Sequence, residues 1–445
     1  MATGAFRDTL ALRINQRLFY GWIVLLVAAL GYFASGPGQS HLFGVFITPI
    51  SEDLGISRTA ISTAYATATL IAAFGLPYVG RLVDRFGARR VALVVVIVLG
   101  FASIGFGQVT GVITLGLGFM LLRFLGQGSL MLTCQNMTAQ WFDRQRGFAL
   151  SLMSLGFFLS VAVHPPLMQW LIALVGWREA WVWLGVATWI LLLPAIYVLV
   201  QNKPEDLGLE PDPPRGGGLQ IGPRISGSAN IGFTAAEALR TPAFWIIAIS
   251  LSTLSMLVTA LFFHQVSIFE SHGLSAGMAA GVFSIAAISA VIAVPVFGRL
   301  LDRFRARPIF ATGMLSMSLT LIALVFVQGF WSAFVYSVIF GVANAVIHSH
   351  MAFLWPRYFG RKHLGQIQGT ATTIAVVGAS VGPIPFGAAY DLFGSYTGAL
   401  LLFALQPVFC AALILFMKPP DLQAHAAAQA AKERAGRHEE APGTA

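Results

Sequence analysis

Charged residues and cysteines are scarce in this chain, and each shortage excludes a class of protein. Charged side chains make up 10% of the 445 residues and hydrophobic ones 57%, whereas a soluble domain carries about 25% charged residues. A soluble globular protein is therefore excluded. The two cysteines, Cys134 and Cys410, both lie in apolar segments, so the sequence indicates no disulfide framework.

Motifs of metal-dependent hydrolysis and of nucleotide binding are also missing. The chain contains no His-Glu-x-x-His motif and no pair of aspartates within an apolar segment. It has no Gly-x4-Gly-Lys-Ser/Thr loop to cradle phosphates, so ATP is not expected to drive it directly. We therefore expect neither an enzyme nor a bound cofactor or metal ion.

Long apolar segments fill most of the chain instead. A hydrocarbon core is crossed by about 20 helical residues, and only helices or closed barrels satisfy their backbone groups there. These segments are too long, and alternate too little, for barrel strands. We predict an all-α integral membrane protein with twelve transmembrane helices, at residues 22–49, 59–79, 91–109, 112–136, 147–175, 179–200, 243–268, 276–297, 309–328, 331–354, 365–389 and 396–417.

Arginine and lysine are distributed unevenly about these segments. If both termini are cytoplasmic, every Lys and Arg lies on the cytoplasmic side except Arg58 and Arg178, which lie outside, and Arg123, which lies within a segment. Because cytoplasmic loops carry an excess of positive charge, we predict a multi-pass protein of the cell inner membrane with both termini in the cytoplasm. The basic residues are scattered between segments, so nucleic acid is not expected as a partner.

One polar loop occurs twice, about half a chain apart. Residues 80–90 read Gly-Arg-Leu-Val-Asp-Arg-Phe-Gly-Ala-Arg-Arg, and residues 298–308 read Gly-Arg-Leu-Leu-Asp-Arg-Phe-Arg-Ala-Arg-Pro. Such self-similarity indicates a repeated structural unit. Further residues match in the same order in both halves: Trp22 with Trp245, His41 with His264, Phe46 with Phe269, and Asp84 with Asp302.

The repeat predicts two pseudo-symmetric six-helix bundles. We place them at 1–200 and 241–420, joined by a Pro- and Gly-rich cytoplasmic linker at 201–240 and followed by a tail at 421–445. Parallel repeats of this kind form one class of transporter, in which the substrate is held near the membrane centre between the halves.

In these motifs the chain resembles the major facilitator superfamily over essentially its whole length. The first copy of the loop matches the family's cytoplasmic signature, which implies that Asp84 and its basic neighbours hold the halves together on that side in the outward-open state. The second copy departs from the signature at Arg305 and Pro308. The predicted gating residues are Gly80, Asp84, Arg85, Gly87, Arg89, Arg90, Asp302 and Arg303.

A glycine- and proline-containing stretch in the eleventh segment resembles the family's kinked-helix motif. Small residues four apart let helices approach closely, and a proline bends the helix. The predicted kink residues are Gly378, Gly382, Pro383 and Gly387.

Weaker matches resemble the monocarboxylate and oxalate/formate porters within that superfamily. They are residues 19–22, 44–46, 141–147 and 390–396. This branch commonly carries a Lys or Arg in spans one, eight or eleven to pair a substrate carboxylate, and this chain has none there. The substrate class therefore follows less directly than the fold.

Arg123 is the one cation inside a predicted span. Inserting it costs roughly 3 kcal/mol, so it should face the bundle interior or a water-filled cavity. Gln127 lies one helical turn further on the same face, and both residues resemble the family's fourth-span motif. Two roles are open for Arg123: it attracts an anionic substrate or tunes a proton site, or it bonds neighbouring helix carbonyls as a structural pin.

Polar residues of the other central spans complete the predicted site. Asn344 and His348 lie one turn apart on one face of the tenth span, and His41 and His264 are symmetry mates in spans one and seven, which usually line the family's cavity. His164 lies at a proline kink and His350 points away from the site. A lone intramembrane histidine can also be a hydrogen-bonded structural residue.

These features predict a secondary transporter that moves a small organic anion by alternating access. Every Asp and Glu lies in a loop, in the tail or at a span end, so a histidine or the substrate's own carboxylate would have to carry any coupled proton. Export of neutral or lipophilic compounds, and ligand sensing on the same fold, stay open. The expected partners are the anion, protons and the lipid bilayer, and we expect a monomer.

Overall fold

The computed structural model describes residues 2–142, 145–212, 232–360, 364–420 and 422. Most of the predicted linker and of the tail, and the side chains of Asp302 and His348, lie outside this described part. The first half contains α1 (Ala2–Asn15), α2 (Gly21–Ala34), η1 (Gly36–Gly38), α3 (Ser40–Phe43), α4 (Ile47–Leu54), α5 (Arg58–Phe86), α6 (Ala88–Phe106), α7 (Val112–Leu122), η2 (Arg123–Leu130), α8 (Met131–Trp141) and α9 (Arg146–Leu199).

Helices also make up the second half of the described chain. It contains η3 (Pro204–Leu207), α10 (Ala235–Leu239), α11 (Pro242–Ser271), α12 (Ala276–Arg303), α13 (Ala306–Val325), α14 (Phe330–Phe359), α15 (Leu364–Val381), α16 (Pro383–Phe393) and α17 (Thr397–Phe416).

Helix starts follow from ordinary capping chemistry. Ser57, Thr241 and Ser275 each accept a backbone N–H of the first turn of α5, α11 and α12 through the side-chain oxygen. Such caps satisfy one of the N–H groups that the first turn leaves without a partner. The long apolar helices of a membrane protein therefore begin at polar residues, where the chain leaves the hydrocarbon core.

Ten helices in the described chain are long and apolar enough to cross a membrane. The longest, α9, contains two crossings, because Gly176 (φ 82°, ψ 165°) leaves the helical conformation and turns the chain back. The positive φ favours glycine there. With the shorter apolar α2 as the first crossing, the helices follow the predicted twelve-span plan.

The first predicted span is wrong as a single helix. The segment 22–49 is broken into α2, η1, α3 and the start of α4. Pro37 has no N–H to donate, and the backbone N–H of Gly38 bonds the carbonyl of Ser35 in a tight turn. The fourth span is irregular at the same level, because η2 is a π-helix.

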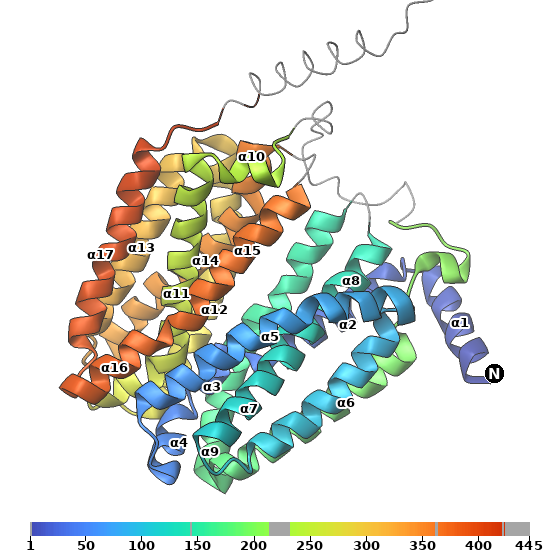
Figure 1. The fold of residues 1–445 in the computed structure, drawn as a ribbon. Coiled ribbons are helices and arrows are strands. Elements are labelled where there is room, and N and C mark those ends of the chain that lie inside the picture. Colours follow the sequence, from blue (N-terminus) through green and yellow to red (C-terminus); the bar gives the residue numbers. More distant parts are fainter. Residues whose placement is uncertain (1, 143–144, 213–231, 361–363, 421, 423–445) are drawn as a thin grey trace, which may run out of the picture.

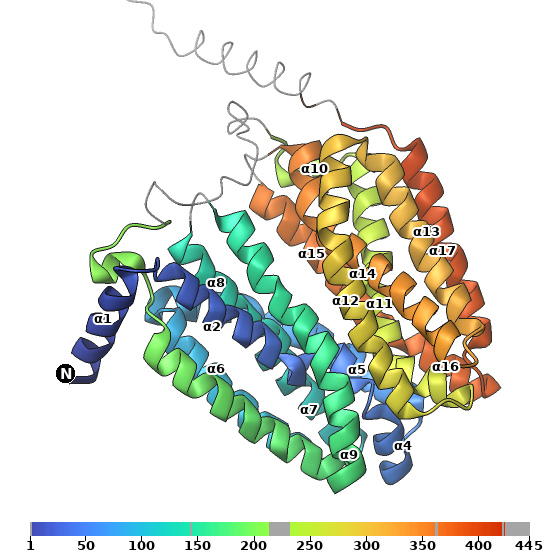
Figure 2. The same ribbon diagram turned by 180° about the vertical axis from the view of Figure 1, so that it is seen from behind.

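The helices form two bundles that meet at one end. Figures 1 and 2 show the bundles converging where α4 and α16 lie and separating toward the end that carries α10. Contacts between the bundles join α5 to α15 and α16, α9 to α12, and α11 to α3 and α4. We name the end where α4 and α16 lie the contact end, and the opposite end the α10 end.

Candidate functional site

Arg123 lies at the start of η2 and is 5% exposed. Its Nε donates to Thr69 Oγ1 at 3.1 Å and its Nη1 donates to the Gly38 carbonyl at 3.1 Å. The guanidinium carbon lies 5.0 Å from the centre of the Tyr65 ring, within reach of a cation–π attraction. In the described chain Arg123 has no acidic partner, so its charge is balanced only by neutral dipoles and an aromatic face.

The break in the first span and the π-helix of the fourth span fit each other. A Cβ atom on Gly38 would lie 2.5 Å from the Leu122 carbonyl oxygen and 2.6 Å from the Gln127 amide nitrogen, so only glycine allows this approach. Irregular backbone at membrane depth needs new hydrogen-bond partners, and Arg123 supplies one to Gly38. Gln127 is half-buried on the same π-helix. The break is therefore bonded directly to the charged residue.

His41 and His164 are brought together on the other side of this break. Ser160 Oγ lies 3.1 Å from His41 Nε2 and 2.9 Å from His164 Nδ1. The His164 ring stacks on Phe33, and a Cβ on Gly36 would lie 2.8 Å from the ring. Sequence spacing gave no indication of this pair, because the two histidines lie in different spans, far apart along the chain.

His264 occupies a different environment from its symmetry mate. It is fully buried, and its Nε2 lies 2.9 Å from the Pro383 carbonyl and 3.2 Å from Ser62 Oγ. Both His41 and His264 bond a residue 119 positions further along their own half. Only His264 also bonds the opposite half, through Ser62 of α5.

A charged and aromatic cluster surrounds His264 at the contact end. Arg58 donates to the Tyr396 hydroxyl at 2.7 Å and lies 3.8 Å above the Tyr390 ring. The Tyr396 hydroxyl lies 3.5 Å from His264 Nδ1. Tyr396 is buried, so its hydroxyl depends on these side chains for its hydrogen bonds. This cluster was missed, because Arg58 and Asp391 lie at span ends.

The predicted residues of the tenth span are placed only in part. Asn344 is 5% exposed on α14, whereas the side chain of His348 lies outside the described part. His350 bonds the Val346 carbonyl through Nδ1 at 2.9 Å and stacks on Phe310 of α13. Its ring therefore packs between helices of its own half, away from Asn344.

The first copy of the repeated loop is exposed at its acidic residue. Asp84, Arg85 and Arg90 are exposed, and in the described chain Asp84 forms no ion pair. Arg89 is held within its own half, because its Nη2 donates to the Tyr197 carbonyl at 2.7 Å and its backbone N–H to Asn202 Oδ1. Gly87 adopts φ 84° against Asn202, whereas Gly80 has open space around it.

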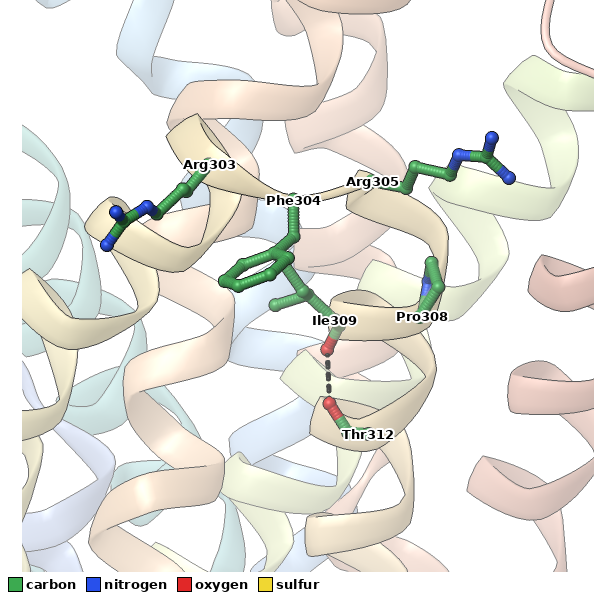
Figure 3. Close-up of a pocket in the computed structure, with 6 residues that line it drawn as sticks. All are labelled: Arg303, Phe304, Arg305, Pro308, Ile309 and Thr312. Atoms are coloured by element: carbon green, nitrogen blue, oxygen red, sulfur yellow. Dashed lines mark hydrogen bonds between the residues drawn. The ribbon is translucent and has the colours of Figure 1, made fainter.

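The second copy lines a shallow cavity of about 540 Å³ at the turn between α12 and α13. Figure 3 shows the exposed side chains of Arg303 and Arg305 pointing away from each other, with Phe304 between them and Thr312 bonded to the Ile309 carbonyl. Two arginines that diverge cannot chelate one small anion. We do not assign the substrate to this cavity.

The kink residues lie where two helices meet closely. α15 ends at Val381 and α16 begins at Pro383. A Cβ on Gly382 would lie 2.3 Å from the Met256 carbonyl, and one on Gly378 would lie 2.2 Å from Ser252 Oγ, both on α11. Gly387 instead faces the other half, because a Cβ there would lie 2.9 Å from the carbonyl oxygen of Arg58 and from Ser62 Oγ.

The chain also contains a Gly-x-Ser-x-Gly pattern at 273–277. In hydrolases this pattern places a nucleophile on a strand-to-helix turn. Here it connects α11 to α12, and Ser275 Oγ accepts the backbone N–H of Met278 as a helix cap. The pattern therefore serves the start of α12.

Comparisons with known proteins agree with this architecture. The oxalate:formate antiporter of Oxalobacter formigenes is 25% identical over 266 residues, which are 59% of this chain and 58% of that protein. The 4-hydroxybenzoate transporter PcaK of Acinetobacter baylyi is 24% identical over 41% of this chain and 40% of its own length. These matches span roughly half of each relative's length.

A solved structure shows the same fold. The crystal structure of a bacterial homologue of the human lysosomal transporter Spinster, in an inward-facing and unoccupied conformation, superposes with a TM-score of 0.64 at 18% identity over 89% of this chain and 94% of that one. The model of the Major Facilitator Superfamily matches residues 22–292 and 251–440. With its twelve-span, two-bundle architecture, the chain belongs to the Major Facilitator Superfamily.

Proposed function

We propose that the protein is a secondary transporter that moves a small organic anion across the inner membrane by alternating access. One observation carries the proposal: Arg123 is buried at mid-span without an acidic partner in the described chain, and it bonds only neutral groups there. A buried cation without a counterion strongly attracts an anion, because little solvent screens the field around it. A monocarboxylate or small dicarboxylate fits this charge.

The partners of Arg123 indicate how binding would move the protein. A carboxylate accepts stronger hydrogen bonds from a guanidinium than a peptide carbonyl does. An anion that replaces the Gly38 carbonyl would free the break in the first span, whose opposite side touches His164. We infer that η1 transmits anion binding from Arg123 to the His41–Ser160–His164 cluster, the group through which a coupled proton would pass.

The relatives support this class of substrate. The two relatives described above are named for oxalate, formate and 4-hydroxybenzoate, all of which are carboxylates. We extend the class, and not any one of these compounds, to this chain.

Orientation follows from the positive charges. With the α10 end in the cytoplasm, the exposed Asp84 loop and the Arg303 loop face the cytoplasm, and the contact end faces outward. We infer from this orientation that the two bundles are arranged in an inward-facing state, and we propose that the protein works as a monomer. We propose that its units are the bundles 1–200 and 241–420, and we expect the linker 201–240 and the tail 421–445 to lie in the cytoplasm.

The test is uptake by purified protein in liposomes. A panel of labelled lactate, formate, oxalate and 4-hydroxybenzoate is offered with and without an inward proton gradient. We expect at least one anion to be taken up and competed by the others, and Arg123→Gln to abolish uptake. Arg123→Lys should retain part of it, because the charge remains while the paired geometry of the guanidinium is lost.

A matched control separates binding from structure. Arg357 donates to the Leu301 carbonyl at 3.3 Å, so Arg357→Lys changes another arginine that bonds a helix carbonyl. Its uptake should stay near wild type. Transport of a lipophilic neutral compound, with no uptake of any anion, would favour an exporter instead. Ligand binding without uptake would favour a sensor.

A further inference from the structure

We propose that His264 controls closure at the contact end, and that protonation of its ring separates the two halves there. The inference deepens the proposed function by naming a residue through which an outside proton opens the carrier. The inference rests on the hydrogen bonds that connect Arg58 to Tyr396, Tyr396 to His264, and His264 to Pro383.

The position of the ring proton follows from the bonding partners. Pro383 offers a carbonyl oxygen, which can only accept, so His264 Nε2 carries the proton in the 2.9 Å bond between them. The neutral ring then has a lone pair at Nδ1, and this atom faces the Tyr396 hydroxyl at 3.5 Å. The closed arrangement therefore fits a neutral histidine in a single tautomer.

Tyr396 fixes the direction of the remaining bonds. Its hydroxyl oxygen accepts the Arg58 guanidinium N–H at 2.7 Å, and the Ser267 hydroxyl bonds the same atom. With both groups donating to this oxygen, its own proton points at His264 Nδ1. A proton added to Nδ1 would meet this hydroxyl donor to donor. Tyr396 would have to turn away, and the chain from Arg58 to Pro383 would be interrupted.

Charge acts in the same direction as geometry. His264 is completely buried, and Arg58 lies one hydroxyl away from it. A second positive charge at this place would repel Arg58 at low solvent screening. Three acidic groups lie in this region. Glu52 and Glu270 line one cavity with Arg58 and Tyr390, and the two oxygens of Asp391 already accept the backbone N–H groups of Arg58 and Thr59. The other neighbours of the ring, Ser62, Phe263 and Phe386, are neutral.

The contacts of Asp391 show which helices are joined at the contact end. Asp391 belongs to α16, and it accepts the N–H groups of Arg58 at 3.3 Å and Thr59 at 2.7 Å in the first turn of α5. A carboxylate of one half thus caps a helix of the other half. With Arg58 bonded to Tyr396, the start of α5 is fastened to α16 and to the turn before α17. Loss of the His264 bonds removes the buried part of this fastening.

The test measures the separation at the contact end directly. Spin labels are placed at Thr110 and Leu392, which are exposed on opposite halves near this end, in a chain whose two buried cysteines are replaced by alanine. Electron–electron distances are recorded in lipid nanodiscs at pH 8 and at pH 5, without substrate. We expect a short-distance population at pH 8 and a shift toward longer distances at pH 5.

Three variants decide the inference. In His264→Gln the side-chain N–H can still reach Pro383 but cannot be charged, so the pH-dependent shift should be lost and the short distance kept. Asp391→Asn should raise the long-distance population at both pH values. His350→Gln, a change at another buried histidine that bonds a helix carbonyl, should respond to pH as the wild type does.

The outcomes separate this inference from the proposed function. A wild-type distance that ignores pH, or a shift that persists in His264→Gln, would overturn the role of His264 whatever the liposomes transport. A pH-dependent shift in a protein that takes up no anion would leave the closure mechanism standing and reject the anion. Monodisperse elution of each variant shows that it is folded, so the distances report closure alone.

Discussion

At the residue scale, the most important position is Gly38, where the lack of a side chain allows two irregular backbone segments to meet. Gly38 has no Cβ, so the broken first span lies directly on the π-helix of the fourth span, and Arg123 can bond its carbonyl. The charge of Arg123 was visible in the sequence, but its partner was not. A carbonyl freed by a break depends on tertiary packing, which a local pattern does not contain.

Gly38→Ala tests this packing. The added methyl group would lie 2.5 to 2.9 Å from backbone atoms of Leu122, Gly126 and Gln127, which cannot turn aside as a side chain can. Overpacking of this kind costs about 1–3 kcal/mol, and it should also weaken the Arg123 bond. We expect a lower midpoint of thermal unfolding in detergent and reduced uptake of any transported anion.

Gly105→Ala is the matched control for that substitution. Gly105 lies in α6 with open space around its Cβ position, and alanine is the better helix former. Its unfolding midpoint should stay unchanged or rise slightly. If both variants behaved alike, close packing at the break would not explain the effect of Gly38.

At the element scale, the twelve apolar segments were predictable and their internal irregularities were only partly so. Segment length and hydropathy locate a membrane helix because the bilayer imposes them. The break at Gly36-Pro37-Gly38 had a local signal, since Gly-Pro-Gly is a strong breaker. The π-helix at Arg123 had none. The pairing of His41 with His164 depends on how α9 crosses the first span, so it needed the fold.

The kink helix gives a prediction at this scale. Gly387 of α16 faces α5, and a Cβ there would lie 2.9 Å from the Arg58 carbonyl and from Ser62 Oγ. Gly387→Ala should push α16 away from α5 without changing any charge. We expect the long-distance population between labels at Thr110 and Leu392 to increase at pH 8, with the response to acid still present because His264 is intact.

The comparison position for Gly387 is Gly398 of α17, where an added Cβ meets nothing within 4 Å. Gly398→Ala should leave the label distances as they are. An unchanged distance distribution in Gly387→Ala would show that the closure tolerates a wider contact between α5 and α16, and that this glycine does not set it.

At the scale of the whole molecule, the two ends are built from different interactions. The contact end joins the halves through a buried histidine, an arginine on aromatic rings and a carboxylate that caps a helix. At the α10 end Asp84, Arg85 and Arg90, which the family resemblance assigns to gating, are exposed, and within the described residues Arg89 bonds only its own half. Because an alternating carrier closes one end at a time, we propose that this loop acts as a gate in the state opposite to this one.

Asp84→Asn tests this division between the two ends. Asp84 is exposed and has no ion-pair partner in the described chain, so its substitution should change the stability of this state by no more than about 0.5 kcal/mol. It should, however, destabilise the opposite state, in which the carboxylate is expected to be bonded across the halves. We therefore expect an unchanged thermal unfolding midpoint, a smaller long-distance population at pH 5 between labels at Thr110 and Leu392, and slower uptake. A lowered thermal unfolding midpoint with unaltered label distances would show that Asp84 stabilises the present state. It would contradict a role for Asp84 in gating.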